Sequence, residues 1–387
     1  MEAPRSGSSD GGIVGHALRF SPCGKYLAVA ANEQVRVFRW GGSEEWELLA
    51  CKEGVAASAH QSLIRSLAWN TSGQIVATAA DDKWLKLWKT DSETGHYHLL
   101  ASRLHNKKIS AVAFGCAAGG QEHVLYADKF GEVHSLPVEQ VSTAEPVLLL
   151  GHLSIVTDLV VSPAHDFIIT ADRDEKIRVS HFPYAYDIQA FCLGHTQFVS
   201  KLVTITSSLS STHLLVSGSG DGTLRLWDYA NGTPLFKCQV EGICATSIPA
   251  AYHSASNVLI ALMEGVRSLY LYRLVVDGDK HQLQSLTTLA LDSAPIDATF
   301  DEKGNVWVAC EQGLQLFVQE NSTEGSITYS EVGAVPRHCM HTPFQSLIGA
   351  LKQAINNNDS EFLTEIRLAR LRKRSDVDDM HKKARNK

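Results

Sequence analysis

The sequence predicts an all-β fold, a seven-bladed β-propeller of WD-type repeats, followed by a helical, basic C-terminal extension. Three observations predict this fold. A strand–turn–strand unit recurs along the chain, its four clearest copies are spaced by 46 or 47 residues, and no helix-length apolar pattern interrupts them. A four-stranded propeller blade takes about 40–45 residues, so the spacing fits this architecture.

The recurring unit consists of two short strands around a turn. The strongest copy reads LLVSGSGDGTLRLWD from residue 214, and its clear relatives start at residues 75, 123 and 167. Aligning them places the turn aspartates at Asp82, Asp128, Asp174 and Asp221. Weaker copies start at residues 25, 257 and 305, which brings the count to seven. One blade cannot bury both of its faces alone, so we expect the seven units to close into a ring.

These repeats predict the domain organisation. We expect a flexible N-terminal segment over residues 1–14, the propeller over 15–319, a connecting segment over 320–343 and a helical, basic tail over 344–387. The tail pattern begins with an amphipathic stripe, in which apolar residues recur at helical spacing from Phe344 to Ile355. A second helical pattern follows from Phe362.

Composition and charge narrow the function. The 387 residues are 44% hydrophobic and 20% charged, no stretch approaches the roughly 18 apolar residues of a membrane span, and residues 1–12 do not resemble a secretory signal. The eight cysteines lack the spacing of a zinc site, so we expect reduced thiols and no bound metal. We expect the protein in the nucleus, with the cytoplasm as a further location.

The charge is unevenly distributed. Residues 367–387 contain nine Lys or Arg and three Asp, so they carry +6, and the remaining 366 residues carry −13 of the total of −7. An acidic body with a basic tail suggests that the tail has an anionic partner. The basic side chains of this second helical pattern are Arg367, Arg370, Arg372, Lys373 and Arg374, and they form a candidate RNA-binding arm. The alternative is a solubilising or nuclear-targeting tail.

Two units contain residues in the order of the hydrogen-bonded tetrad that ties a WD blade together. These sets are His195, Ser217, Asp221 and Trp227 in unit five, and His60, Thr78, Asp82 and Trp88 in unit two. Unit four has His152, Thr170 and Asp174, but Ser180 stands where the Trp would be. We therefore expect a weaker tetrad in that blade.

No catalytic centre is predicted. A His, Ser and Asp set could suggest a hydrolase triad, but a triad is a single strained site, whereas this set recurs with the blade period and includes Trp. The glycines of GSGDG at residues 218–222 lack the GKS or GKT ending of a phosphate-binding loop, so a turn is the better interpretation. No Gly-rich loop suited to a dinucleotide or a methyl-donor cofactor is found. We expect a non-enzymatic chain that binds no cofactor.

The turn of unit four is the strongest candidate for partner binding. Where unit five has the small Ser-Gly-Asp-Gly-Thr, unit four has the charged run Asp172-Arg173-Asp174-Glu175-Lys176. Such a turn can make charge-assisted contacts with another protein, or it can be a solvated turn whose charges pair with each other. Arg178 is a further candidate, although its alignment with Arg36, Lys86 and Arg225 fits a repeat consensus. Lys129, in the turn of unit three, is a candidate neighbour or an ordinary exposed lysine.

Units four and five carry a more specific likeness. The segments are GHLSIVTDLVVSP from residue 151, TADRDEKIRVS from 170, CLGHTQFVSKL from 192 and SGDGTLRLWDY from 219. They resemble the WD-repeat, non-catalytic subunit of the eukaryotic tRNA guanine-N7 methyltransferase. The resemblance is close over about a fifth of the chain and architectural over most of the rest, and TADRDEKIRVS is its most discriminating segment.

This resemblance implies a scaffold that binds and stabilises a separate catalytic subunit, which holds the methyl donor, in a heterodimer that methylates tRNA. It implies interface roles for Arg173, Asp174, Lys176 and Arg178, with Lys129 beside them, and tRNA contacts for the C-terminal arm. The tail departs from the family's more continuous Lys/Glu/Gln-rich tail. Two alternatives are a substrate receptor of a cullin-type ubiquitin ligase and a chromatin or repair scaffold. The receptor signature Trp-Asp-x-Arg is absent here, since Trp227-Asp228 is followed by Tyr229-Ala230.

Overall fold

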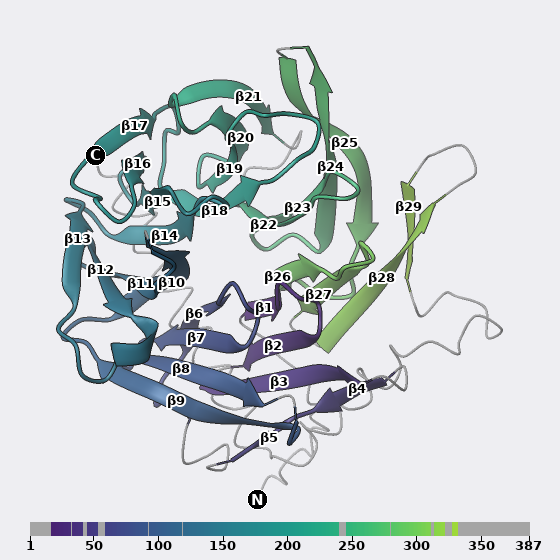
Figure 1. The fold of residues 1–387 in the computed structure, drawn as a ribbon. Helices are drawn as coiled ribbons and strands as arrows, with labels where there is room; N and C mark the ends of the chain where they lie inside the picture. The colour runs from purple at the N-terminus through teal and green to yellow at the C-terminus, as the bar shows by residue number, and fades with distance from the viewer. Residues whose placement is uncertain are drawn as a thin grey trace, which may run out of the picture.

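The computed structural model describes residues 17–331, except residues 32, 42–44, 53–58, 92, 118, 240–244, 279, 311–312 and 322–326. Within this part of the chain, seven sheets surround a common axis (Figure 1). The predicted all-β class and the seven-bladed propeller are confirmed. The segment before residue 15 and the tail predicted over 344–387 lie outside the described residues. No helix among those described is long and apolar enough to span a bilayer.

Each blade is built from four strands that are consecutive in the sequence. Blade one contains β1 (Ala17–Phe20), β2 (Tyr26–Ala31), β3 (Gln34–Gly41) and β4 (Glu45–Leu48). Blade two contains β6 (Ile64–Trp69), β7 (Ile75–Ala80), β8 (Trp84–Asp91) and β9 (His96–Leu104), and β5 (Ala50–Cys51) adds a short parallel strand beside β9. Blade three contains β10 (Ile109–Cys116), β11 (Glu122–Asp128), β12 (Glu132–Pro137) and β13 (Val147–Gly151), with the 3-10 helix η1 (Val138–Gln140) after β12.

The remaining blades repeat this plan. Blade four contains β14 (Val156–Val161), β15 (Phe167–Asp172), β16 (Ile177–His181) and β17 (Ile188–Cys192). Blade five contains β18 (Val199–Ile205), β19 (Leu214–Ser219), β20 (Thr223–Asp228) and β21 (Thr233–Gln239). Blade six contains β22 (Ser247–His253), β23 (Val258–Met263), β24 (Ser268–Asp277) and β25 (Lys280–Ala290). Blade seven contains β26 (Pro295–Phe300), β27 (Val306–Cys310), β28 (Gly313–Asn321) and β29 (Ile327–Glu331).

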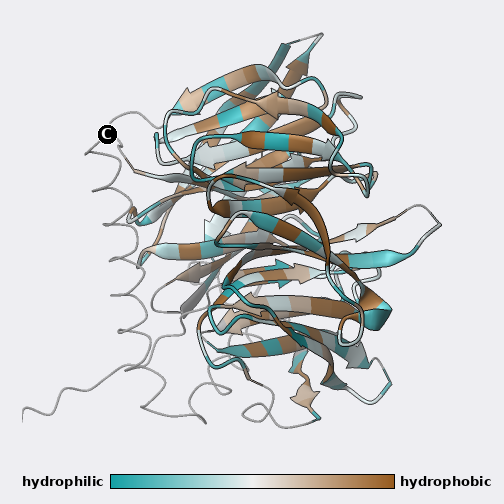
Figure 2. Ribbon diagram, turned by 90° about the vertical axis from the view of Figure 1, so that its left-hand side faces the viewer, coloured by the Kyte–Doolittle hydropathy of each residue, from teal (hydrophilic) through white to brown (hydrophobic). Residues whose placement is uncertain are grey.

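The hydrophobic core lies between blades rather than inside any one of them. The second strands β15, β19, β23 and β27 are buried along their whole lengths, as expected for strands covered on both faces. Between blades three and four, Leu125 and Val133 pack with Leu159 and Ile168. Hydrophobic residues follow the strands and hydrophilic residues gather in the connecting loops (Figure 2). Stacking of neighbouring blades therefore provides the burial that a single blade lacks.

Ring closure joins the first and last blades through their innermost strands. The Asp297 carboxylate on β26 accepts a hydrogen bond from the backbone N–H of Leu18 on β1 (3.0 Å) and pairs with Arg19 (2.6 Å). Lys201 of blade five lies 3.5 Å from the other oxygen of this carboxylate. Burial alone would raise the pKa of Asp297, but Arg19 and Lys201 hold it below its ordinary value. Blades one and seven each keep their own four strands, so side-chain contacts close the ring.

Two further features concern the limits and faces of the propeller. Blade seven continues beyond the predicted limit at residue 319, because β28 extends to Asn321 and β29 pairs with it up to Glu331.

Each blade has one face where its second and third strands are joined by a tight turn, as at residues 129–131 and 173–176. We call this side of the disc the turn face. The links that lead from one blade to the next, such as 152–155, lie on the same side because strands alternate in direction.

Candidate partner-binding surface

The predicted tetrads of blades two and five are brought together. In blade two, Trp88 donates to the Thr78 hydroxyl (2.9 Å), His60 Nε2 lies 2.9 Å from the same hydroxyl, and His60 Nδ1 lies 2.9 Å from Asp82. A single tautomer satisfies the whole chain, since Thr78 then donates to Nε2 and Nδ1 donates to the carboxylate. Burial lowers the pKa of His60, which keeps this imidazole neutral. Blade five has the same contacts among His195, Ser217, Asp221 and Trp227, at 2.7–3.0 Å.

In blade four the expected tetrad is wrong in one residue, the aspartate that bonds the histidine. His152 Nε2 lies 2.7 Å from the Thr170 hydroxyl as expected, but Nδ1 lies 3.0 Å from Asp172, not from Asp174. Asp172 ends β15 and its other oxygen accepts the backbone N–H of Lys176 (2.9 Å). The alignment of the turn aspartates had favoured Asp174, but the backbone brings the earlier carboxylate to the histidine. Ser180, which replaces the Trp, accepts a hydrogen bond from Arg178 Nε (2.9 Å).

Blade three shows the same shift. His105 Nε2 lies 3.1 Å from Asp128, and Asp128 ends β11 as Asp172 ends β15. The strand registers place Tyr126 opposite His134 and Thr170 opposite Arg178, so Asp128 corresponds to Asp172, two residues before the position of Asp174. The predicted equivalence of Asp128 with the turn aspartates Asp82 and Asp221 is therefore wrong.

The shift leaves the turn of blade four free to face solvent. Arg173 and Asp174 have side chains that are 40% and 45% exposed, and their nearest charged atoms are 3.8 Å apart. Glu175 has a positive φ of 74°, which closes the turn, and the Lys176 ammonium donates to the backbone carbonyl of Asp174 (3.3 Å). The charges of this turn thus pair only loosely with each other, at distances where solvent competes effectively. They remain available to another protein.

Lys129 occupies the corresponding position in the preceding blade, blade three. The backbone N–H of Lys129 donates to Lys108, and that of Arg173 donates to Ile155, so both residues lie at the same step of their turns. The Lys129 ammonium lies 3.8 Å from Asp81 of blade two, which Lys108 also approaches (3.8 Å). Burial would raise the pKa of Asp81, but its hydrogen bond with Arg65 and the nearby lysines lower it. Several cations therefore share one carboxylate, which leaves this part of the turn face basic.

Arg178 lies deeper than the other candidates. It is half-buried on β16, where NH2 donates to the carbonyl of Ala185 (2.8 Å) and NH1 lies 3.4 Å from the carbonyl of Gly151. Burial lowers its pKa. These bonds link β16 to the end of β13 in blade three and to the loop between β16 and β17, so Arg178 supports the shape of this edge.

Two exposed apolar residues beside these charges were not predicted. Phe130, in the turn of blade three, is 68% exposed, and Leu153, in the link to blade four, is 107% exposed. Their segments adjoin, because His152 N–H donates to the carbonyl of Gly131 (2.9 Å) and a Cβ on Gly131 would lie 2.5 Å from the carbonyls of His152 and Ser154. The sequence does contain a signal for them, because turns are usually polar and here an apolar residue stands in each segment, in KFGE at residues 129–132 and in GHLS at residues 151–154. We call Lys129, Phe130, Leu153, Arg173 and Lys176 the blade three–four patch.

The predicted RNA-binding residues cannot be placed on this surface. Arg367, Arg370, Arg372, Lys373 and Arg374 lie outside the described residues.

Comparison with known sequences agrees with the resemblance of blades four and five. The family model described as the tRNA methyltransferase TRM82 WD40 domain matches residues 30–147 and 139–328. The chain is 33% identical over 303 residues to the tRNA (guanine-N(7)-)-methyltransferase non-catalytic subunit WDR4 of Mus musculus, covering 75% of this chain and 70% of that protein. It is 35% identical to the Homo sapiens protein of that name, covering 62% and 58% respectively. The matched region thus spans little more than half of the human relative.

Solved structures support the fold alone. The structure of U3-55K superposes with a TM-score of 0.59 at 17% identity, covering 77% of this chain and 88% of that one. The WD40 propeller domain of Doa1 superposes with a TM-score of 0.57 at 14% identity, covering 80% and 96%. The sequence matches, which extend over most of the propeller, decide the family: this chain belongs to the WD-repeat family of tRNA guanine-N7 methyltransferase non-catalytic subunits.

Proposed function

We propose that this chain is the scaffold of a tRNA guanine-N7 methyltransferase, and that it binds and stabilises the catalytic subunit through the blade three–four patch. Family membership supports the scaffold role, since relatives are named as non-catalytic subunits. The methyl donor then belongs to the partner.

The location of the proposed interface rests on one observation: exposed apolar side chains lie beside cations that form only loose ion pairs. Phe130 and Leu153 offer an apolar centre, while Lys129, Arg173 and Lys176 offer cations around it. Buried apolar anchors with a polar rim are typical of stable protein interfaces. The turns are held by backbone bonds to the links that precede the innermost strands β10 and β14, so little order has to be gained on binding.

The tRNA is positioned mainly by the complex, with the basic arm of residues 367–387 adding phosphate contacts. An acidic propeller repels RNA, whereas nine Lys or Arg in 21 residues attract it through counterion release. The complex acts in the nucleus, which imaging of a fluorescent fusion of the full chain would test.

Co-expression with a guanine-N7 methyltransferase subunit tests the proposal. Size-exclusion chromatography should show co-elution, and tRNA methylation should require both proteins. Leu153→Asp should abolish co-elution, whereas Leu209→Asp should not, because Leu209 is also exposed but lies in the opposite face's loop between β18 and β19. Absence of a complex at low and moderate salt would reopen the ligase-receptor and chromatin-scaffold alternatives. A complex that tolerates Leu153→Asp would place the interface elsewhere.

A further inference from the structure

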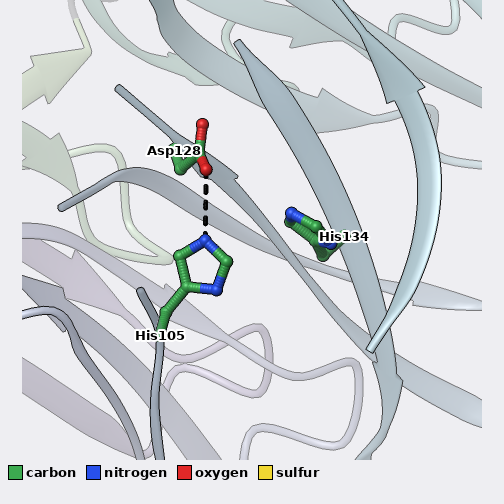
Figure 3. Close-up of side chains that lie close together, drawn as sticks. All are labelled: His105, Asp128 and His134. Carbon is green, nitrogen blue, oxygen red and sulfur yellow. Dashed lines mark hydrogen bonds and ion pairs between the residues drawn. The ribbon is translucent and has the colours of Figure 1, made fainter. Parts of the chain in front are cut away.

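Blade three carries a cluster of metal-binding side chains in place of a complete tetrad. His105, Asp128 and His134 each offer a ligand atom, and these atoms all lie within 4.8 Å of one another. Figure 3 shows His105 directed at Asp128, with the His134 ring beside them. His105 precedes β10, Asp128 ends β11 and His134 lies on β12, so three separate segments converge.

Among the residues that the structure describes, blade three is the only one with such a cluster. His134 lies opposite Tyr126 in the strand register, where blades two, four and five have Lys86, Arg178 and Arg225 opposite Thr78, Thr170 and Ser217. A long cation has therefore been replaced by an imidazole at one position of the repeat. Lys86 and Arg178 donate to backbone carbonyls and Arg225 lies over the Trp227 ring, whereas the imidazole of His134 stays next to the His–Asp pair.

His134 lacks the hydrogen bonds that a buried imidazole normally makes. Its side chain is only 12% exposed, and both ring nitrogens are buried without a hydrogen-bond partner. Buried polar groups are nearly always paired, and an unpaired one requires an explanation such as an ion.

Asp128 and Glu132 supply the negative charge of the cluster. One Asp128 oxygen lies 3.1 Å from His105 Nε2, while the other accepts the backbone N–H groups of Phe130 and Glu132, which orients the carboxylate. Glu132 lies 3.6 Å from His134 Nε2, longer than a hydrogen bond. A cavity of about 240 Å³ lined by His105 and His134 gives access from solvent.

We propose that His105, Asp128 and His134 form a binding site for a divalent transition-metal ion, zinc in particular, with Glu132 or water as the fourth ligand. Zinc takes nitrogen and carboxylate ligands at about 2.0–2.2 Å in tetrahedral geometry, so neighbouring ligand atoms lie roughly 3.4 Å apart. The distance of 3.1 Å between His105 Nε2 and the Asp128 carboxylate is close to this ligand–ligand distance. The three ligand atoms lie within 4.8 Å of one another, so the third would have to move closer to the other two.

The ion would fasten the turn that contributes Lys129 and Phe130 to the blade three–four patch. Asp128 and His134 flank this turn on β11 and β12, so one ion ties both strands to the link that contains His105. The site is independent of the proposed scaffold function, since it rests on the ligand cluster alone.

Zinc titration of the tag-free full chain by calorimetry tests the site. His134→Lys is the decisive variant, because lysine is the residue of blade two at this register position and preserves the blade while removing a ligand. His181→Gln is the matched control, since His181 lies on β16 of the neighbouring blade and is 39% exposed. His134→Gln replaces His134→Lys if circular dichroism shows that the lysine variant does not fold.

The wild-type chain and His181→Gln should bind one zinc ion, with a rise in Tm and with the visible bands of tetrahedral Co²⁺ when cobalt replaces zinc. Removal of the His134 ligand should weaken the affinity at least tenfold and abolish both the Tm rise and the cobalt bands. Absence of saturable binding by the wild-type chain would overturn the proposal. Equal affinity in the His134 variant would also overturn it, because the metal would then bind elsewhere among the 17 histidines and eight cysteines.

Discussion

His152 Nδ1 bonds Asp172 at 3.0 Å, two residues before the aspartate that the repeat alignment favours. Blade three has its bonding carboxylate at the same structural position, since His105 bonds Asp128, which ends β11 as Asp172 ends β15. In blades two and five the turn aspartate itself bonds the histidine. In blade four this pair ties His152 to the end of β15 and leaves Asp174 on the surface, so a structural carboxylate and an exposed charged turn lie within three residues of each other.

The displaced pair predicts unequal effects of two neighbouring substitutions. Asp172→Ala should lower the free energy of unfolding by about 1–3 kcal/mol, because it leaves the buried His152 nitrogen and the Lys176 N–H without their acceptor. Asp174→Ala should change it by no more than about 0.5 kcal/mol, as for most exposed sites. Urea denaturation of the two variants measures the difference. A larger loss for Asp174→Ala would contradict the assignment.

Ring closure depends strongly on Asp297. Asp297→Ala should destabilise the propeller by about 3 kcal/mol, because the partly buried Arg19 and Lys201 lose a buried counter-charge and Leu18 N–H loses its acceptor. Asp277→Ala, on the exposed end of β24, is the control. Equal unfolding midpoints for the two variants would show that blade packing alone closes the ring.

Stability should fall as the pH is lowered. The pKa of Asp82 and that of Asp172 lie below the ordinary value of 3.8, because hydrogen bonds from His60 and His152 outweigh burial, which alone would raise them. Burial lowers the pKa of His60 from 6.5. In each case the unfolded chain takes up its proton first. The stabilisation is therefore complete above the unfolded pKa and is lost as the pH falls through the folded one.

Two steps should follow in a plot of Tm against pH. A shallow decline is expected below about pH 6.5, where unfolded histidine becomes protonated, and a steeper one below about pH 4, where the carboxylates do. Differential scanning calorimetry at pH 8, 6, 5, 4, 3.5 and 3 checks both steps. A Tm that rises on acidification from pH 8 to 5 would be inconsistent with these shifts.

Charge reversal on the turn of blade four should disrupt partner binding. Arg173→Glu with Lys176→Glu replaces two cations of the blade three–four patch and should weaken binding of the catalytic subunit by more than tenfold, while circular dichroism and Tm stay unchanged. Lys237→Glu, on the exposed outer strand of blade five, should have little effect. Wild-type affinity of the double variant would remove this turn from the interface.

Truncation before Glu361 should weaken tRNA binding more than binding of the catalytic subunit. The removed segment includes the nine basic residues of 367–387, so tRNA affinity of the complex should fall and become less dependent on salt. Electrophoretic mobility shifts over a salt series give both quantities, and co-elution with the catalytic subunit serves as the control. Unchanged tRNA affinity would leave the tail as a solvated extension.

The architecture and the family follow from the repeat pattern and motifs of the sequence. A period of 46 or 47 residues with alternating apolar strands is a local pattern, and only stacking around a ring buries both faces of each unit, so the seven-bladed propeller follows from the repeat. The two complete tetrads could also be predicted from the sequence, because His60 and His195 precede units of standard length and composition.

The pairing of each histidine with its carboxylate, and the contact between neighbouring turns, depend on the path of the backbone in three dimensions. Asp172 and Asp174 are two residues apart and chemically identical, so the backbone path at the end of β15 selects between them. Phe130 and Leu153 become one surface because the Gly131 turn packs on the His152 link. His134 stands in the register position that holds a lysine or arginine in blades two, four and five, and burial without a hydrogen-bond partner is a property of packing that a sequence does not display.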